Sequence, residues 1–287
     1  MITQTLFNGL VTGAIISLPA LAITLLFGVL KFPNFAVGSI VTVAAYAVFA
    51  LNVQLGWPLL VAAVVAAALC GAFLILVDSV IFRPMRDSGS ITLMVASLGL
   101  GLILENLARF FYGNAARSFD LELSMPFRVG ALRMNSEQLV AIGMSALLML
   151  AMYLLLMRMP MGRKMRAIAD NPSLALVRGI DRAQVIRWTW MINGTLLAGA
   201  GVLIGMDRAL EPLMGTNYLI AIFAAAILGG LGSPLGAFVG ALIVGTSSEL
   251  STLVLPPGYR TGVPLCFIAA ILIWRPQGLF GRPLIRR

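Results

Sequence analysis

Few side chains in this sequence could take part in chemistry, and the most unusual is Glu105, an acidic residue well inside a long apolar segment. An ionisable group in hydrocarbon is costly, so its presence is by default a hypothesis of function. Arg109 follows four positions later, and an ion pair within one helix is the interpretation we favour. Glu249 closes another apolar segment beside Ser248 and Ser251, and we expect it to face a vestibule or another subunit.

Catalytic residues are missing from the sequence. It contains no histidine, and no two carboxylates have a useful spacing. The glycine-rich stretches at residues 99–101 and 229–232 lack the Lys-Ser or Lys-Thr that completes a phosphate-binding loop. Cys70 and Cys266 lie in separate apolar runs and indicate neither a disulfide nor a metal site. We expect no enzyme activity, cofactor or metal on this chain, so any energy source is an ion gradient or a partner subunit.

The composition places these side chains in a membrane protein. Of the 287 residues, 60% are hydrophobic and 11% are charged, and the mean hydropathy is +0.99. A soluble domain of this length needs more charge to cover its surface, so we predict an all-α, polytopic integral membrane protein in contact with lipid. The net charge of +9 does not indicate nucleic acid, because the basic residues flank apolar segments instead of forming a basic domain.

Apolar segments follow one another along the whole chain, which we interpret as one transmembrane domain over residues 1–287 with about eight or nine segments. The first has no basic region or small-residue cleavage site before it, so we expect it to be a retained span. The segments after Asn34 and around Tyr218 are the candidates for half-helices or re-entrant segments. The segments cover residues 5–30, 40–51, 59–82, 91–112, 139–157, 188–206, 218–230, 235–255 and 263–274.

Basic residues set the expected orientation. The connection at residues 158–187 is the most charged in the chain, and the positive-inside rule predicts that it is cytoplasmic. Threading the segments from there places Lys31, Arg83 and Arg86 inside as well, the N-terminus outside and the C-terminus inside. The C-terminal stretch adds Arg275, Arg282, Arg286 and Arg287 to the same side.

The 158–187 connection has its own helical signals. Residues 163–169 have helical character, and Asp170-Asn171-Pro172 gives a break in which Asp170 or Asn171 can cap a following short helix over residues 173–177. Gly179 suits the end of that helix. Two short amphipathic helices on a cytoplasmic face form a docking surface, although many charged loops are only solvated topology signals.

Glycine and proline interrupt two apolar segments in a similar way. Residues 229–236 read Gly-Gly-Leu-Gly-Ser-Pro-Leu-Gly, and residues 27–38 also pass from a span through a break to a small-residue helix. Matched interruptions in two halves of a membrane protein point to a central transport site, whereas a single break can also be an ordinary turn. Asn34 and Asn193 either line a pathway or cap broken helices. The small residues from Gly194 to Gly201 predict close helix packing.

An ordered series of short motifs covers nearly the whole chain. The first is Asn34-Phe35-Ala36 after Leu26-Phe27-Gly28. The others lie at residues 167–175, 179–181, 193–201, 211–215, 228–236 and 275–281. In this order they resemble the permeases of ABC importers for branched-chain amino acids.

The resemblance implies a permease of the bacterial-type cytoplasmic (inner) membrane. Its partners would be a second homologous permease, a periplasmic or extracellular substrate-binding protein and two cytoplasmic ATPase subunits, which would hold ATP and Mg. The ATPase-coupling residues are then expected to be Arg163, Arg166, Asp170, Asn171, Pro172, Ala175, Gly179 and Ile180. The expected pathway residues are Asn34, Phe35, Ser39, Glu105, Asn193, Gly230 and Gly232.

One departure from the family pattern leaves the substrate open. The family often has His-Gly-Glu after Asn-Phe-Ala, where this chain has Val37-Gly38-Ser39. Another small amino acid, a short amide or urea is therefore an alternative substrate. The alternative mechanisms are an ion-coupled secondary transporter, which would need Glu105 or Glu249 as an ion site, and a passive channel for a small solute. A membrane enzyme is the weakest alternative because no catalytic constellation is present.

Overall fold

A computed structural model describes residues 2–120, 127–129 and 132–281 of the chain. Of the basic residues used above to orient the chain, Arg282, Arg286 and Arg287 lie outside this part. The all-α expectation is confirmed for the described residues, apart from a short antiparallel hairpin of β1 (Phe127–Val129) and β2 (Leu132–Met134).

Each apolar segment of the sequence corresponds to a helix. Two of these helices continue directly as π-helical turns, α2 into η1 (Ala50–Gln54) and α3 into η2 (Asp78–Phe82). Among the described residues, six spans are long and apolar enough to cross a membrane, and α9 and α11 include shorter apolar stretches. The helices are α1 (Ile2–Leu30), α2 (Val37–Phe49), α3 (Leu59–Val77), α4 (Ser90–Tyr112), α5 (Ser136–Arg158), α8 (Arg182–Asp207), α9 (Met214–Gly229), α10 (Pro234–Ser251) and α11 (Gly262–Trp274).

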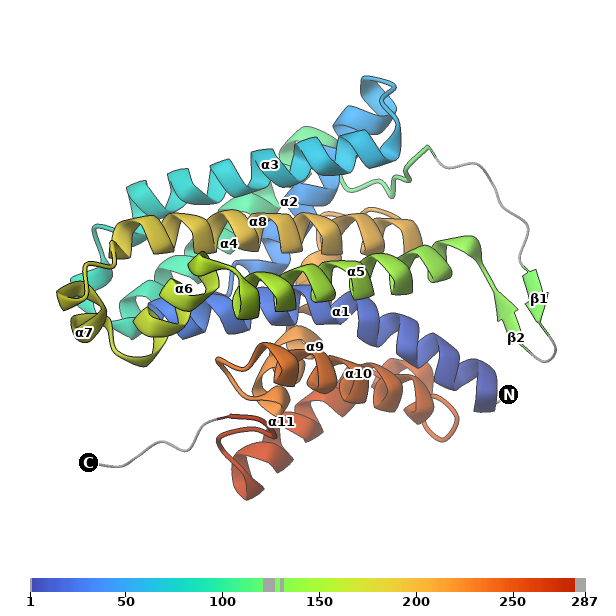
Figure 1. Ribbon diagram of the computed structural model, residues 1–287. Helices are drawn as coiled ribbons and strands as arrows, with labels where there is room; N and C mark the ends of the chain where they lie inside the picture. Colours follow the sequence, from blue (N-terminus) through green and yellow to red (C-terminus); the bar gives the residue numbers. More distant parts are fainter. Residues whose placement is uncertain (1, 121–126, 130–131, 282–287) are drawn as a thin grey trace.

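The long helices run roughly along one axis, and two short helices lie at one end of it (Figure 1). These are α6 (Pro160–Asp170) and α7 (Pro172–Val177), and we name this the α7 end. The opposite end carries the N-terminus and the β1–β2 hairpin, and we name it the hairpin end (Figure 1).

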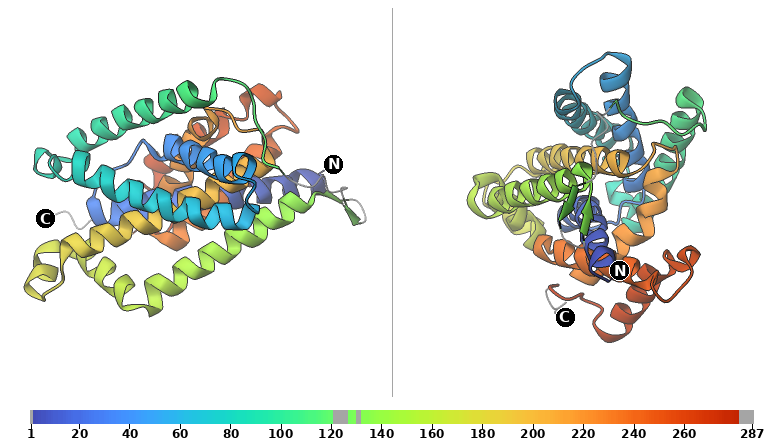
Figure 2. Two further views of the ribbon diagram at one scale, coloured as in Figure 1. Left: turned by 90° about the horizontal axis from the view of Figure 1, so that it is seen from above. Right: turned by 90° about the vertical axis from the view of Figure 1, so that its right-hand side faces the viewer.

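Helix α1 forms the centre of the bundle. It contacts α5, α8, α9 and α10, and the end-on view in Figure 2 shows it enclosed by them. Its contact with α10 is close because Gly9 and Gly13 face Gly245 and Ala241, where small residues let the two backbones approach. The core therefore lies along α1, while α3 and α5 leave most of their apolar surface uncovered, as lipid-facing or subunit-facing helices do.

Small residues also bring α8 close to its neighbours, as the 194–201 series predicts. Gly194 lies against Gly71 of α3, and Gly201 lies against Val41 and Ala45 of α2. Helix α8 begins at Arg182, earlier than the apolar pattern indicates. The reason is a polar cap, because the Asp181 carboxylate accepts a hydrogen bond from the Ala183 N–H at 2.8 Å.

Candidate functional site

The chain between α1 and α2 returns into the bundle before it becomes helical again. Residues 31–36 contain no helix, and Lys31 has a positive φ of 59°. A Cβ placed on Gly101 would lie 3.3 Å from Ser39 Oγ and 3.5 Å from Ala36 Cα. Gly101 is half-way along α4, about 16 Å from either end at 1.5 Å per residue. Helix α2 therefore begins near half-depth in the bundle.

Helix α9 begins at the same depth from the opposite direction. Helix α8 ends at the hairpin end, and residues 208–213 turn back, held by a two-way backbone pairing of Leu210 with Arg117. The Gly215 N–H at the start of α9 donates to Thr42 Oγ1 of α2 at 3.1 Å. Gly38 and Gly215 are in backbone contact, with no room for a Cβ on either. Two helix N-termini thus meet inside the bundle.

Polar groups satisfy the backbone at this meeting point. Asn34 Oδ1 accepts a hydrogen bond from the Ala36 N–H at 3.0 Å, and the Phe35 N–H donates to the buried Ser97 Oγ at 3.0 Å. The Phe35 ring stacks on Phe223 of α9, with 4.7 Å between the ring centroids. Since backbone groups without partners are not tolerated in a membrane, these bonds explain how an extended segment survives at this depth.

Glu105 lies beside the start of α9. Its carboxylate forms an ion pair with Arg109 Nη2 at 2.7 Å, as the i,i+4 spacing predicts. The Thr216 hydroxyl donates to the other carboxylate oxygen at 3.4 Å. A carboxylate at a helix N-terminus is stabilised by the helix dipole. Asn34, Phe35, Ser39 and Glu105 are therefore brought together around the two helix starts.

The other expected pathway residues lie elsewhere. Asn193 is buried in α8 and donates from Nδ2 to the Thr189 carbonyl at 3.1 Å, within its own helix. Gly230 and Gly232 have φ of 103° and 95° and form the turn between α9 and α10 at the α7 end. The break at residues 229–236 thus differs in depth from the one at residues 31–36, which lies inside the bundle.

Residues 275–281 close the α9–α10 turn. The Leu279 and Phe280 N–H groups donate to the Leu228 and Gly229 carbonyls at 2.8 and 3.0 Å, which satisfies carbonyl groups left without partners at the end of α9. A C-terminal motif and an internal glycine motif are therefore one structural unit.

Glu249 is part of a polar cluster at the hairpin end. Its carboxylate pairs with Arg260 and accepts a hydrogen bond from Thr12 Oγ1 at 3.1 Å. This cluster links α1, α10 and the segment before α11, so the partner of Glu249 comes from its own chain.

The expected coupling region has the local structure that its sequence predicts. Asn171 caps α7, and its side chain accepts a hydrogen bond from the Leu174 N–H at 3.0 Å. Gly179 follows with φ of 76°, the left-handed conformation that favours glycine after a helix. The Ile180 N–H donates to the Ala175 carbonyl at 3.0 Å.

The two short helices cover the bundle with one face and expose the other. Met165, Ile168 and Ala175 are buried. Val177 is 85% exposed, and Leu174 and Leu176 are each more than half exposed. Arg163, Arg166, Asp170 and Asn171 are also exposed, while Pro172 and Ile180 are half-buried. An apolar patch at the end of the bundle, ringed by charge, is typical of a protein contact surface.

Comparison with known proteins places this architecture in a family. Residues 5–273 match the family described as branched-chain amino acid transport system, permease component. The chain belongs to this family. The permease protein LivH of the high-affinity branched-chain amino acid transport system of Escherichia coli K12 is 28% identical, over 99% of this chain and 97% of that protein. The probable LivH of Methanocaldococcus jannaschii is 30% identical, over 96% and 91% of the two chains.

A solved structure has the same fold at low identity. A chain of PsaBC from Streptococcus pneumoniae, in complex with a Fab, matches with a TM-score of 0.51 and 16% identity. The match covers 95% of this chain and 92% of that chain. The permease fold described above is thus also found in an experimental structure.

Sequence reasoning about the permease missed the role of Lys31. Its Nζ donates to the Ala169 carbonyl at the end of α6 at 2.9 Å, and its own carbonyl accepts from Ser90 Oγ at 3.1 Å. Partial burial lowers the pKa of Lys31 below its usual value, and the nearby Asp170 carboxylate offsets part of this shift. One side chain therefore joins the expected coupling helix to the segment that leads to half-depth. Its signal in the sequence was a lone lysine before the Phe-Pro-Asn break.

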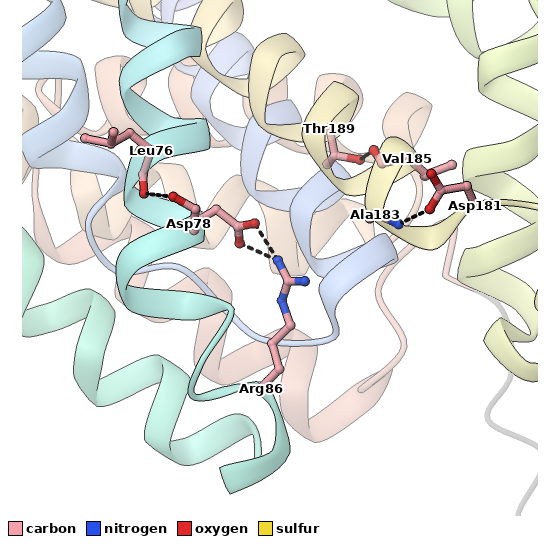
Figure 3. A network of polar contacts seen from close by, with 8 residues as sticks. Leu76, Asp78, Arg86, Asp181, Ala183, Val185 and Thr189 are labelled. Carbon is pink, nitrogen blue, oxygen red and sulfur yellow. Dashed lines mark hydrogen bonds and ion pairs between the residues drawn. The ribbon is translucent and has the colours of Figure 1, made fainter.

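A buried ion pair at the α7 end was missed as well. Asp78 of η2 and Arg86 point toward one another (Figure 3), with Arg86 Nη2 2.5 Å from both carboxylate oxygens. Beside them the Phe82 ring stacks on Trp190 at 5.5 Å and contacts Phe32 at 5.4 Å. The pair fastens the end of α3 to the loop before α4. Its signal was a single acid inside the apolar run at residues 59–82.

Proposed function

We propose that this chain is the transmembrane permease subunit of an ATP-driven ABC importer that carries branched-chain or related small amino acids across the cytoplasmic (inner) membrane. Two findings support the proposal: its membership of the permease family and the meeting of the α2 and α9 N-termini at half-depth. The meeting of the two N-termini supports the transport mechanism, because transporters bind and pass their substrates at interrupted helices near the midplane.

The pathway we propose runs along α9, past the paired starts of α2 and α9. Asn34 and Ser39 flank this point, and the stacked Phe35 and Phe223 rings form a constriction toward the α7 end. Glu105 keeps its charge paired with Arg109, which favours a structural role over the ion site that a secondary transporter requires. Gly230 and Gly232 would act indirectly, by supplying the positive φ angles that the turn between α9 and α10 requires.

The partners follow from the same proposal. A permease component needs an energy source, and the α6–α7 surface supports docking of cytoplasmic ATPase subunits that hold ATP and Mg²⁺. Arg163 and Arg166 would contact such a subunit, and the Asn171 and Gly179 caps would hold α7 in shape for it. A second homologous permease would complete the pathway, and a substrate-binding protein would deliver the amino acid at the hairpin end.

The orientation we propose places the α7 end in the cytoplasm and the N-terminus outside. Most of the basic residues support it under the positive-inside rule, since they lie at or next to the α7 end. Those described are Lys31, Arg83, Arg86, Arg158, Arg163, Lys164, Arg166, Arg178, Arg182, Arg187 and Arg275.

The docking proposal is tested with Val177→Asp in the reconstituted importer. A charge forced into an apolar contact costs more than the 1.4 kcal/mol that corresponds to a tenfold change, so copurification of the ATPase subunits should fall about tenfold or more. Uptake should fall with it.

Val254→Asp is the matched control. Val254 is 86% exposed, in the turn after α10 at the opposite end, and this variant should keep its ATPase subunits. If Val177→Asp retains the ATPase subunits as well as Val254→Asp does, α7 is not the docking element.

A further inference from the structure

A small polar cavity opens beside the start of α9, on the side of the hairpin end. Its volume is about 150 Å³, below the roughly 300–1,000 Å³ of sites for drug-sized ligands. It lies between the last turn of α8, the returning segment at residues 208–213 and the first turn of α9. Its lining residues are Ile204, Arg208, Ala209, Glu211, Met214, Asn217 and Tyr218.

The cavity presents both signs of charge. The Arg208 guanidinium lies over the Tyr218 ring at 5.8 Å and 3.7 Å from the Asp207 carboxylate, yet its side chain is 55% exposed. Glu211 is exposed on the returning segment. Among the described residues, none forms an ion pair with Glu211. An exposed carboxylate without an ion pair among the described residues and a partly exposed guanidinium therefore line one cavity.

The rest of the lining is suited to an aliphatic group. Ile204 and Met214 are almost fully buried and form an apolar wall. Asn217 and Tyr218 add an amide and a phenol, which donate and accept hydrogen bonds. Few polar groups set against an apolar wall are the usual composition of a small-molecule site.

A free α-amino acid is the ligand whose chemistry matches the two opposite charges, the hydrogen-bonding groups and the apolar wall. Such a molecule carries a carboxylate and an ammonium on one carbon, and an aliphatic side chain extends away from both. Urea and short amides carry no charge, so they could form an ion pair with neither Arg208 nor Glu211 and would gain less from this cavity than a zwitterion.

We propose that this cavity is an outer subsite for a zwitterionic aliphatic amino acid. Arg208 pairs with the substrate carboxylate, Glu211 pairs with the ammonium, and Ile204 and Met214 contact the side chain. From here the substrate passes along the first turn of α9, where Thr216 meets Glu105. The inference rests on the proposed import function and narrows its substrate class.

The test uses the whole importer in nanodiscs without the binding protein. Ala209→Cys in a Cys266→Ser background places a thiol in the cavity, while the native Cys70 stays buried. At about ten times its Kd, leucine should slow maleimide labelling of this thiol about tenfold, because the free fraction falls by that factor. Isovalerate, isoamylamine and urea, which lack one or both charges, should not protect at the same concentration.

Arg208→Gln and Glu211→Gln should each abolish protection by leucine. Arg133→Gln, the same change at an arginine of the hairpin outside the cavity lining, should keep it. Protection that survives both cavity variants, or protection by urea equal to that by leucine, overturns the proposal.

A parallel uptake assay separates this proposal from the proposed function. If the unmodified importer takes up leucine with ATP but leucine never protects the thiol, the subsite is wrong and the import function stands. If the importer takes up urea and no amino acid, the proposed substrate class fails together with the subsite.

Discussion

Lys31 shows how much one residue can connect in this permease. It has a positive φ, ends α1, bonds to the last turn of α6 and precedes the segment that reaches half-depth. Its ammonium lies at a helix C-terminus, where a cation is stabilised by about 0.3–1 kcal/mol at an exposed site. A movement of α6 imposed by an ATPase would be transmitted to residues 31–36 through this bond.

Lys31→Met should therefore weaken coupling more than it weakens ATP hydrolysis. Loss of about 1 kcal/mol shifts an equilibrium about fivefold, so uptake per ATP hydrolysed should fall by up to that factor. Both rates are measured on the reconstituted importer. Lys164→Met, on the same helix α6 as Ala169, removes the other lysine of the chain and should leave the ratio unchanged. Equal ratios in the two variants would remove Lys31 from the coupling route.

At the scale of elements, the important contact is between the N-termini of α2 and α9. Neither helix runs the full length of the bundle. Each begins where a glycine, Gly38 in α2 and Gly215 in α9, allows the two backbones to touch. The apolar pattern alone places both segments in the membrane, but it carries no information on where within the membrane they start. The hydrogen bond from the Gly215 N–H to Thr42 Oγ1, and the absence of a Cβ atom at Gly38 and Gly215, hold the two helix starts together at that depth.

Gly215→Ala should separate these helix starts. The added methyl group would overlap the Gly38 carbonyl, and such overpacking typically costs about 1–3 kcal/mol. We expect a lower thermal unfolding temperature of the purified importer and reduced uptake. Gly99→Ala on α4, where nothing lies within 4 Å of the new methyl group, is the control and should be neutral or stabilising. Equal unfolding temperatures for the two variants would contradict the close contact.

At the scale of the whole molecule, the two ends of the bundle differ in chemistry. The α7 end holds most of the basic residues and an exposed apolar patch on α7. The hairpin end holds the cavity with Arg208 and Glu211 and the Glu249–Arg260 cluster. In the orientation we propose, the first end would meet an ATPase in the cytoplasm and the second would receive substrate from outside.

This polarity predicts the labelling of single cysteines in intact cells. In the Cys266→Ser background, Val254→Cys should react with a membrane-impermeant maleimide added outside, and Val177→Cys should react only after the membrane is permeabilised. Both valines are highly exposed, so accessibility to the reagent decides the result. The reverse pattern would invert the proposed orientation.

Much of the architecture was predictable from local patterns. Runs of apolar residues located the helices, and Asn171 and Gly179 marked the ends of α7, because capping depends on residues a few positions apart. The start of α8 at Arg182 was missed, because the Asp181 cap extends the helix beyond its apolar part. The Glu105–Arg109 pair was also predictable, since both partners lie on one helix turn. Lys31, Asp78 and the cavity at Arg208 and Glu211 were not found, because their partners are set by the loops and by packing between helices.

The sequence by itself determined the fold class, a helical membrane protein, together with its permease family and the local structure of the α6–α7 region. Hydropathy, caps and ordered motifs are properties of short stretches of sequence. Only the tertiary structure decided that the break at residues 31–36 runs from the α7 end to half-depth while the break at residues 229–236 forms a turn. Both breaks contain a proline, and glycine lies within the second and on either side of the first, at Gly28 and Gly38. Their depth depends on which helices they pack against, and that is a relation between residues distant in the chain.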